Sequence, residues 1–187
     1  VGVLTANLSD DSAIRDEHDV TEFSSKGTGD SIPVTAFRFL LNQIRMCVVI
    51  ARRDDDAVLF FGSTSYVLPV VFSRLIGRTV IVEPRGDVPL SLRLKWEKQA
   101  PDIVARLLAD AVWGMERVSY HAASAIITYT PSMADELGLR KSDKKLYTDG
   151  ARYVDTDRFD VTVPFEERQN LVGFVGRLDV EKGVDKM

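Results

Sequence analysis

The stretch "AVLFFGSTSYVLPVVFSRLIGRTVIVEP", residues 57–84, has the pattern of a strand, a helix and a second strand. Its ends, "AVLFFG" and "TVIVEP", are short apolar runs rich in β-branched and aromatic residues, and they stop at a glycine and a proline. The segment between them is apolar and ends at Gly77, as short helices do. Because the apolarity of the two end runs is continuous, we expect strands buried on both faces of a parallel sheet.

The same alternation of strand and helix runs through most of the chain. "AIITYT" at residues 125–130 repeats the strong strand pattern, and weaker versions occur at residues 1–6, 20–25, 145–150 and 170–176. Apolar residues at helical spacing predict further helices at residues 33–53, 102–122 and 131–138. This order predicts an α/β fold, a Rossmann-like doubly wound parallel sheet.

The domain organisation follows from a change in composition near residue 150. The stretch "RYVDTDRFDVTVPFEERQN", residues 152–170, is polar, contains Pro164 and has no clear periodicity. We therefore expect a first domain at residues 1–150, a linker at 151–170 and the opening strand–helix unit of a second, incomplete domain at 171–187. Only about 13 mostly polar residues separate the first two expected strands, which is near the lower limit for a parallel crossover.

The composition is that of a soluble globular protein, with 45% hydrophobic and 28% charged residues. A net charge of -4 argues against a nucleic-acid partner, because binding to a phosphate backbone needs an excess of cations. Cys47 is the one cysteine, lies among apolar neighbours and is expected to be a buried thiol in a reducing, cytoplasmic compartment. No uninterrupted apolar run reaches the roughly 18 residues that span a bilayer.

An anion site is the strongest chemical signal, at "GFVGRLDVEKG", residues 173–183. The expected strand ends near Gly176, where a ligand can approach the backbone closely. Arg177 leaves the carboxyl end of that strand, and Lys182 stands at the start of the following helix, whose first amides lack intrahelical partners. Two cations and free amides at one place favour a diphosphate. The alternative is an ordinary strand–turn–helix unit with two surface cations.

A second candidate site is the loop after the strand at residues 79–84. In open parallel sheets, ligands bind at the carboxyl ends of the strands, so Arg85, Gly86 and Asp87 are candidates for a cleft wall. The alternative is a turn closed by an internal Arg–Asp pair. Glu116 is interpreted as a residue that ties its helix to a neighbour, and His121 as a capping or core residue. We find no metal-ligand cluster and expect neither a metal nor another cofactor.

Several of these stretches resemble the retaining GT-B glycosyltransferases of family 4. "FVGRLDVEKGV", residues 174–184, resembles the start of their C-terminal domain, and "EPRGDVP", residues 83–89, resembles a loop found in part of the family. "TDGARYVDTDRFD", residues 148–160, resembles a third segment, but Asp149 stands where the family has asparagine and two further residues intervene. The likeness runs from about Ala57 to the end of the chain.

The resemblance implies a two-domain enzyme that transfers a sugar, of the hexosyl type, from a nucleotide-sugar donor to a glycan or lipid-linked acceptor. Residues 1–150 would form the acceptor side, and Gly176, Arg177 and Lys182 would hold the donor diphosphate. The glutamate pair that contacts the donor sugar in the family lies deeper in the second domain, so we expect residues 1–187 alone to be inactive. No catalytic residue is assigned.

Two alternatives remain open at this point. The chain could instead be a non-catalytic α/β module, or a remnant that pairs with a separate partner domain. The helix expected at residues 33–53 could either pack on the sheet with its cations outward or contact a membrane surface, because Arg38, Asn42, Arg45 and Arg52 share one narrow stripe beside a wide apolar face. The second alternative would place the protein peripherally at the inner face of the membrane.

Overall fold

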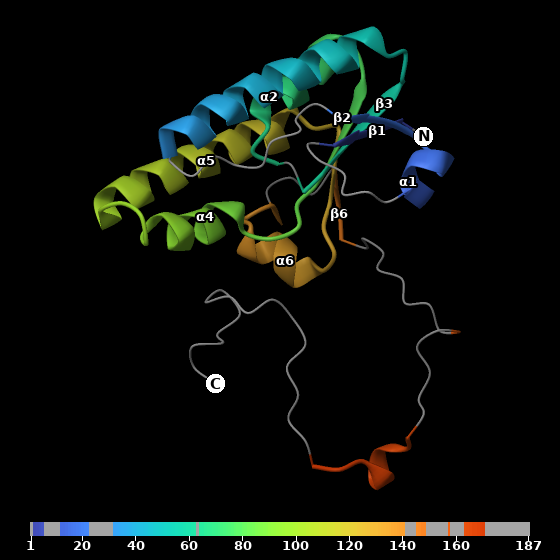
Figure 1. The fold of residues 1–187 in the computed structure, drawn as a ribbon, viewed down its shortest axis with the longest axis vertical. Coiled ribbons are helices and arrows are strands. Elements are labelled where there is room, and N and C mark those ends of the chain that lie inside the picture. The colour runs from blue at the N-terminus through green and yellow to red at the C-terminus, as the bar shows by residue number, and fades with distance from the viewer. Residues whose placement is uncertain are drawn as a thin grey trace.

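The computed structural model describes residues 2–5, 12–22, 32–62, 64–140, 145–148, 157 and 163–170 (Figure 1). Parallel strands alternate with helices, which confirms the predicted Rossmann-like α/β fold. The strands are β1 (Gly2–Thr5), β2 (Asp19–Glu22), β3 (Ala57–Phe61), β4 (Thr79–Glu83), β5 (Ala125–Ile127) and β6 (Leu146–Tyr147). The helices are α1 (Ser12–Glu17), α2 (Ile32–Arg52), α3 (Val67–Leu75), α4 (Val88–Trp96), α5 (Asp102–Ala122), α6 (Pro131–Glu136) and the 3-10 helix η2 (Phe165–Glu167).

The strands form two parallel sheets within the described residues. One has the order β3-β4-β5-β6, and β1 pairs with β2 in the other. Phe61 pairs with Glu83 at the end of the β3–β4 register, so the loops that follow both strands leave the sheet at the same edge. The six-residue helix α1 connects β1 to β2, and this short crossover is enough for a parallel pair.

The core lies between the larger sheet and the helices α2, α3 and α5. Val80 and Val82 of β4 and Ile126 of β5 are fully buried, as expected for central strands of a parallel sheet. The prediction that β3 is buried on both faces is wrong, because Leu59 and Phe61 are 53% and 50% exposed. The reason is the position of β3, which forms the edge of its sheet because β1 does not pair with it.

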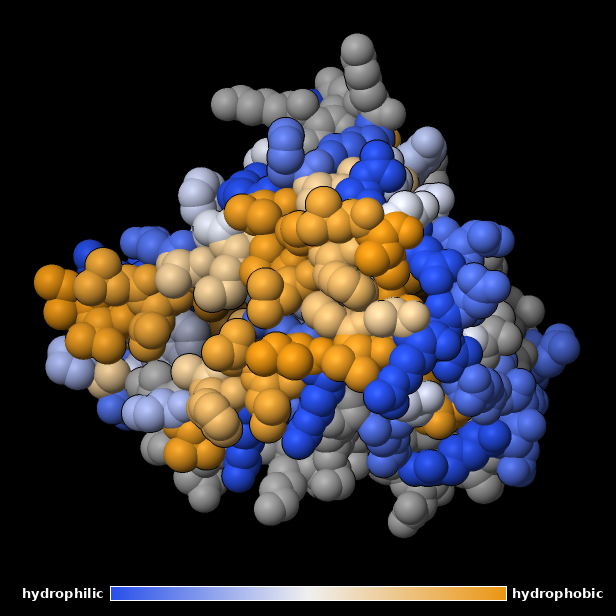
Figure 2. All heavy atoms as spheres, turned by 90° about the horizontal axis from the view of Figure 1, so that it is seen from above, coloured by the Kyte–Doolittle hydropathy of each residue, from blue (hydrophilic) through white to orange (hydrophobic). Residues whose placement is uncertain are grey.

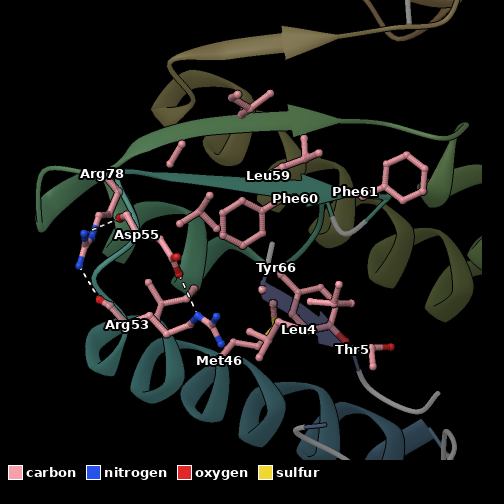
Figure 3. A pocket seen from close by; sticks show the side chains of 16 residues that line it. Leu4, Thr5, Met46, Arg53, Asp55, Leu59, Phe60, Phe61, Tyr66 and Arg78 are labelled. Atoms are coloured by element: carbon pink, nitrogen blue, oxygen red, sulfur yellow. Dashed lines mark hydrogen bonds and ion pairs between the residues drawn. The ribbon is translucent and has the colours of Figure 1, made fainter. Parts of the chain in front are cut away.

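A cavity of about 730 Å³ lies between β1 and β3, beside α2 (Figure 3). Arg53 holds the two sheets together at one end of it, with ion pairs to Asp19 of β2 at 2.8 Å and to Asp55 ahead of β3 at 2.9 Å. A Cβ atom on Gly2 would lie 2.1 Å from Nη2 of Arg53, so the guanidinium occupies the space that a side chain on β1 would need. A larger residue at position 2 would therefore require the flexible end of Arg53 to shift.

Helix α2 is joined to α3 by a buried polar contact. The backbone N–H of Leu68 donates a 2.9 Å hydrogen bond to Oε1 of Gln43, which is 3% exposed. Leu68 lies in the first turn of α3, where amides have no intrahelical partner, and Tyr66 at the N-cap supplies no side-chain acceptor. Gln43 therefore caps α3 from a neighbouring helix.

Helices α1 and α4 were not predicted from the sequence. Helix α4 begins at Val88 behind Asp87, whose Oδ1 accepts a 2.9 Å hydrogen bond from Leu90 N, and it carries Pro89 near its start. Its apolar residues show little helical periodicity, and its packing against α5 supplies the missing stabilisation.

The expected linker is described only in part. Residues 163–170 are exposed, and they include η2. Most of residues 151–162 and all of 171–187, the expected start of a second domain, lie outside the described residues. The three-part domain organisation therefore stays a prediction.

Candidate functional site

The candidate site is built where β3 and β4 end. The backbone N–H of Gly62 donates a 2.8 Å hydrogen bond to the carbonyl of Glu83, which holds the two strand ends together. Gly62 has φ of +68°, a conformation that side chains rarely adopt, and it turns the chain toward the fully buried Thr64. The fully buried Pro84 turns the other chain toward Arg85. The two loops therefore start side by side, as the position of the predicted cleft wall requires.

Arg85 is exposed and lies back over the end of β3. Its guanidinium carbon is 4.6 Å from the centroid of the Phe61 ring, a cation–π contact. A Cβ atom on Gly62 would lie 2.8 Å from Cδ of Arg85. Because glycine has no side chain, it leaves room for the methylene groups of Arg85. The alternative of an internal Arg–Asp pair is wrong: within the part of the chain that the structure describes no ion pair joins Arg85 to Asp87, and Asp87 caps α4. The positive charge of Arg85 faces solvent beside an aromatic ring.

Gly86 separates these two charged residues. A Cβ atom added to it would meet no atom within 4 Å, so packing inside the protein does not demand glycine there. Open space at this position leaves the backbone accessible to a ligand. Arg85, Gly86 and Asp87 thus lie at the carboxyl end of β4, where parallel sheets bind ligands.

Behind this loop, Glu116 of α5 is only 3% exposed. Its Oε1 accepts a hydrogen bond from the hydroxyl of Thr64. Burial raises the pKa of Glu116 to about 7, the Thr64 hydrogen bond opposes that rise, and the negative charge of Asp87 adds to it. The site thus contains two carboxyl groups in different surroundings, one exposed on the loop and one buried with a pKa near neutrality.

Tyr120 lies one turn after Glu116 on the same helix and is 3% exposed. Burial, followed by the charge of Glu116, raises the pKa of the Tyr120 phenol far above its usual range. Its Oη atom is buried and meets no hydrogen-bond partner with good geometry among the described residues, although the nearby hydroxyl of Thr64 opposes the rise of its pKa. A buried hydroxyl without a well-oriented partner is costly to stability.

Arg117 has a different role from its neighbours on α5. Its guanidinium lies over the ring of Trp113 at 4.9 Å and donates to the carbonyls of Leu137 and Gly138, the latter at 3.3 Å. These contacts tie α5 to the end of α6. Arg117 therefore stabilises the fold, and its positive charge also opposes the rise in the pKa of Glu116.

The sequence-based interpretation of Glu116 as a tie to a neighbouring element is consistent with the Thr64 hydrogen bond. The effect of the Asp87 charge on its pKa was not foreseen. The sequence pattern contained a signal for this position. Glu116 follows Ala105 and Ala109 at helical spacing, and all three residues are buried on α5. An acidic residue at a core position of a predicted helix is a reason to look for a partner.

The remaining candidates fall in three groups. Gly176, Arg177 and Lys182 lie outside the described residues. His121 is exposed in the last turn of α5, so the prediction of a core position is wrong. Cys47 is half-buried, and burial raises the pKa of its thiol. Among the described residues, no group of three or more His, Cys, Asp or Glu side chains could hold a metal ion.

No protein-family model, curated protein or solved structure matches this chain. Its functional assignment therefore rests on the residues themselves.

Proposed function

We propose that this chain is the acceptor-side part of a retaining glycosyltransferase, followed by the first unit of the domain that binds a nucleotide-sugar donor. The observation that carries the proposal is the eleven-residue stretch "FVGRLDVEKGV" at residues 174–184. The position of Arg85, Gly86 and Asp87 at the carboxyl ends of parallel strands supports it, because that edge is where an open α/β sheet meets its ligands.

In this proposal, Arg177 and Lys182 hold the donor diphosphate. Cleavage of the sugar–phosphate bond leaves a nucleoside diphosphate on which negative charge grows. Two fixed cations at the leaving oxygens stabilise that charge more in the transition state than in the ground state, so they lower the barrier. No metal is required for this step. Gly176 allows the diphosphate to approach the backbone.

On the acceptor side, Arg85 and Asp87 offer a cation and a carboxylate to the hydroxyl or phosphate groups of a glycan or lipid-linked acceptor. The open space at Gly86 gives such a ligand access to the loop. Glu116 contributes by holding Thr64 and by its charge coupling to Asp87. At 3% exposure Glu116 does not contact an acceptor directly, and we assign it a positioning role.

Nucleoside diphosphate binding to this chain tests the donor half of the proposal. We expect UDP or GDP to shift the phosphorus NMR signals of the ligand in the presence of the 187-residue protein. Arg177→Ala and Lys182→Ala should each weaken binding by about tenfold, the cost of one charge-assisted contact. Arg168→Ala is the matched control, because Arg168 lies in the expected linker and its guanidinium donates to the carbonyl of Val163 at 2.9 Å.

Equal binding by all four proteins would overturn the assignment of the diphosphate site. It would favour the alternative of a non-catalytic α/β module.

Release of sugar from a panel of nucleotide sugars measures the reaction itself. We expect none from residues 1–187 alone, because the resemblance places the carboxylates for the donor sugar deeper in the second domain.

A further inference from the structure

Strand β3 is the edge of the larger sheet, and half of its backbone groups point away from its neighbour β4. The backbone N–H of Gly62 donates to the carbonyl of Glu83 at 2.8 Å, and Thr79 N donates to the carbonyl of Asp56 at 2.9 Å. The N–H and C=O groups of a strand alternate between its two sides, so the residues with even numbers bond to β4. The groups on the opposite side belong to Ala57, Leu59 and Phe61.

The side of β3 that points away from β4 borders the cavity in Figure 3. All five residues of β3 and all four residues of β1 line this cavity. Strand β1 pairs with β2, and no ladder joins β1 to β3 within the described residues. In the same part of the chain, the backbone N–H groups of Leu59 and Phe61 have no hydrogen-bond acceptor. An unpaired edge of this kind is a template for pairing with another strand.

The cavity has the size of a short strand. A strand of five residues occupies about 800 Å³, from a rise of ~3.3 Å per residue, a spacing of ~4.8 Å between strands and a layer thickness of ~10 Å. The volume of the cavity is about 730 Å³. One more strand therefore fits between β1 and β3.

Helix α2 forms an apolar wall of the cavity. Figure 2, which views the molecule from the side on which α2 lies in Figure 1, shows hydrophobic side chains gathered over a broad area, and Phe37 and Ile44 of α2 are 67% and 49% exposed. The segment Pro33–Arg52 is also long and apolar enough to cross a membrane, with a mean hydropathy of 1.5. Its inner side nevertheless belongs to the core, where Met46 and Ile50 are 7% and 6% exposed and line the cavity. The helix is therefore a fixed wall.

The charged groups at one end of the cavity are already paired. Arg53 forms its ion pairs with Asp19 and Asp55, and the guanidinium of Arg78 donates to the carbonyl of Arg53 at 2.7 Å. A charged ligand would have to compete with these contacts. The cavity therefore favours an uncharged one.

The backbone groups decide between two kinds of apolar ligand. An acyl chain would cover the edge of β3 without bonding to it, and a polar group that loses water without gaining a partner is costly. An extended peptide has its own N–H and C=O groups on both sides, so it fills the space and also bonds to the edge. The cavity therefore favours a peptide strand over a lipid chain.

We propose that the cavity between β1 and β3 binds an extended, uncharged peptide segment of a partner protein, which adds a strand to β3 and joins the two sheets. Alternate side chains of the segment enter the cavity beside Phe60, Met46 and Ile50. The others lie at the surface beside Leu59 and Phe61, which are 53% and 50% exposed. The segment therefore alternates apolar and polar residues. The inference does not depend on sugar transfer, and its test involves no nucleotide.

Amide hydrogen exchange, followed by NMR, tests the proposal with the complete 187-residue chain. The probe is an acetylated and amidated hexapeptide that alternates valine and threonine. We expect it to slow exchange at the amides of Leu59 and Phe61 by at least about tenfold, because they gain acceptors. The amides of Val58 and Phe60 should change little, because they already bond to β4. A peptide with three valines followed by three threonines has the same composition but the wrong period, and should bind about tenfold more weakly.

Two further comparisons isolate the backbone hydrogen bonds. N-methyl groups on alternate amides of the valine–threonine peptide remove donors and keep the side chains, so this peptide should not slow exchange in the parent protein. Leu59→Pro removes one N–H from the edge, where proline is tolerated, and should weaken binding by about tenfold, which corresponds to one lost hydrogen bond. Leu59→Ala is the matched control, because it loses the same side chain but keeps the N–H, and it should stay within about threefold of the parent protein. Circular dichroism and thermal melting confirm that both variants are folded.

Equal binding of the alternating, block and methylated peptides would overturn the proposal and would identify apolar contact as the cause. Absence of binding by the alternating peptide would overturn it as well. Slow exchange at Leu59 and Phe61 before any peptide is added would show that the edge is already covered. Sedimentation velocity then identifies the cover, because a dimer indicates a second copy of the chain and a monomer indicates β1 itself.

Discussion

Glu116 on α5 accepts a hydrogen bond from Thr64, which lies 52 residues earlier, just after β3. The contact is buried, and it connects the helix at the back of the sheet to the loop at its carboxyl edge. Asp87, from the loop after β4, is close enough to raise the pKa of Glu116 further. Three segments that are far apart in sequence therefore respond to the protonation of one carboxyl group.

The titration of Glu116 should make the stability of the protein fall as pH rises toward neutrality. Its pKa is raised from 4.5 to about 7 on folding, so between these values the folded chain binds more protons than the unfolded one. The stabilisation is complete below the unfolded pKa and is lost as pH passes the folded pKa, by about 3 kcal/mol in all. Glu116→Gln should remove this loss, since an amide oxygen can still accept from Thr64. Urea unfolding at about pH 5 and about pH 8 measures the difference.

The control for that substitution is Glu136→Gln, which changes an exposed glutamate on α6. This variant should follow the parent protein at both pH values. Parallel loss of stability in the parent and in Glu116→Gln would show that Glu116 is not the group responsible.

Asp87→Asn separates the two roles of Asp87. Asparagine caps helices about as well as aspartate, so α4 should keep its N-cap and the free energy of unfolding should change by less than about 1 kcal/mol. The negative charge beside Glu116 is lost, and the pKa of Glu116 should fall below its value of about 7. Carbon NMR of the Glu116 carboxyl group gives the titration midpoint. Asp110→Asn, an exposed change on α5, should leave that midpoint in place, and an unchanged midpoint in Asp87→Asn would contradict the coupling.

Two glycine substitutions should change the free energy of unfolding in opposite directions. Gly62→Ala places a side chain at φ of +68° and 2.8 Å from Cδ of Arg85, and we expect a loss of about 1 kcal/mol or more. Gly114→Ala lies in the middle of α5, where an added Cβ meets nothing within 4 Å, and should gain about 0.5–1 kcal/mol. Thermal melting of the two variants checks this. A loss in both would mean that Gly114 has an unseen packing role.

Gln43→Leu should destabilise the protein by about 1–3 kcal/mol, because Leu68 N would remain buried without an acceptor. Asn42→Leu, at the neighbouring position on α2, removes an amide that is not needed for this cap and should cost less than about 1 kcal/mol. Chemical denaturation of both variants measures the contrast. Equal effects at the two positions would argue against Gln43 as the cap of α3.

The predicted elements agree with the structure where the pattern is long or strongly apolar. Helix α5 occupies the expected residues 102–122, and β3 and β4 begin at the expected Ala57 and Thr79. The prediction missed α4, whose periodicity is weak and whose stability depends on packing against α5. It also missed that β3 is an edge strand, because strand order is not encoded in a strand's own apolar pattern.

By itself, the sequence determined the parallel α/β class, the position of the loop Arg85–Asp87 at a strand's carboxyl end, and the amphipathic character of α2. These properties depend on residues close together in the chain, whose spacing follows the geometry of helices and strands. Only the tertiary structure brought Thr64, Asp87 and Glu116 together and left Phe37 and Ile44 at the surface. Those outcomes depend on which elements pack against one another, and a buried contact between distant residues exists only once that packing has excluded water from around them.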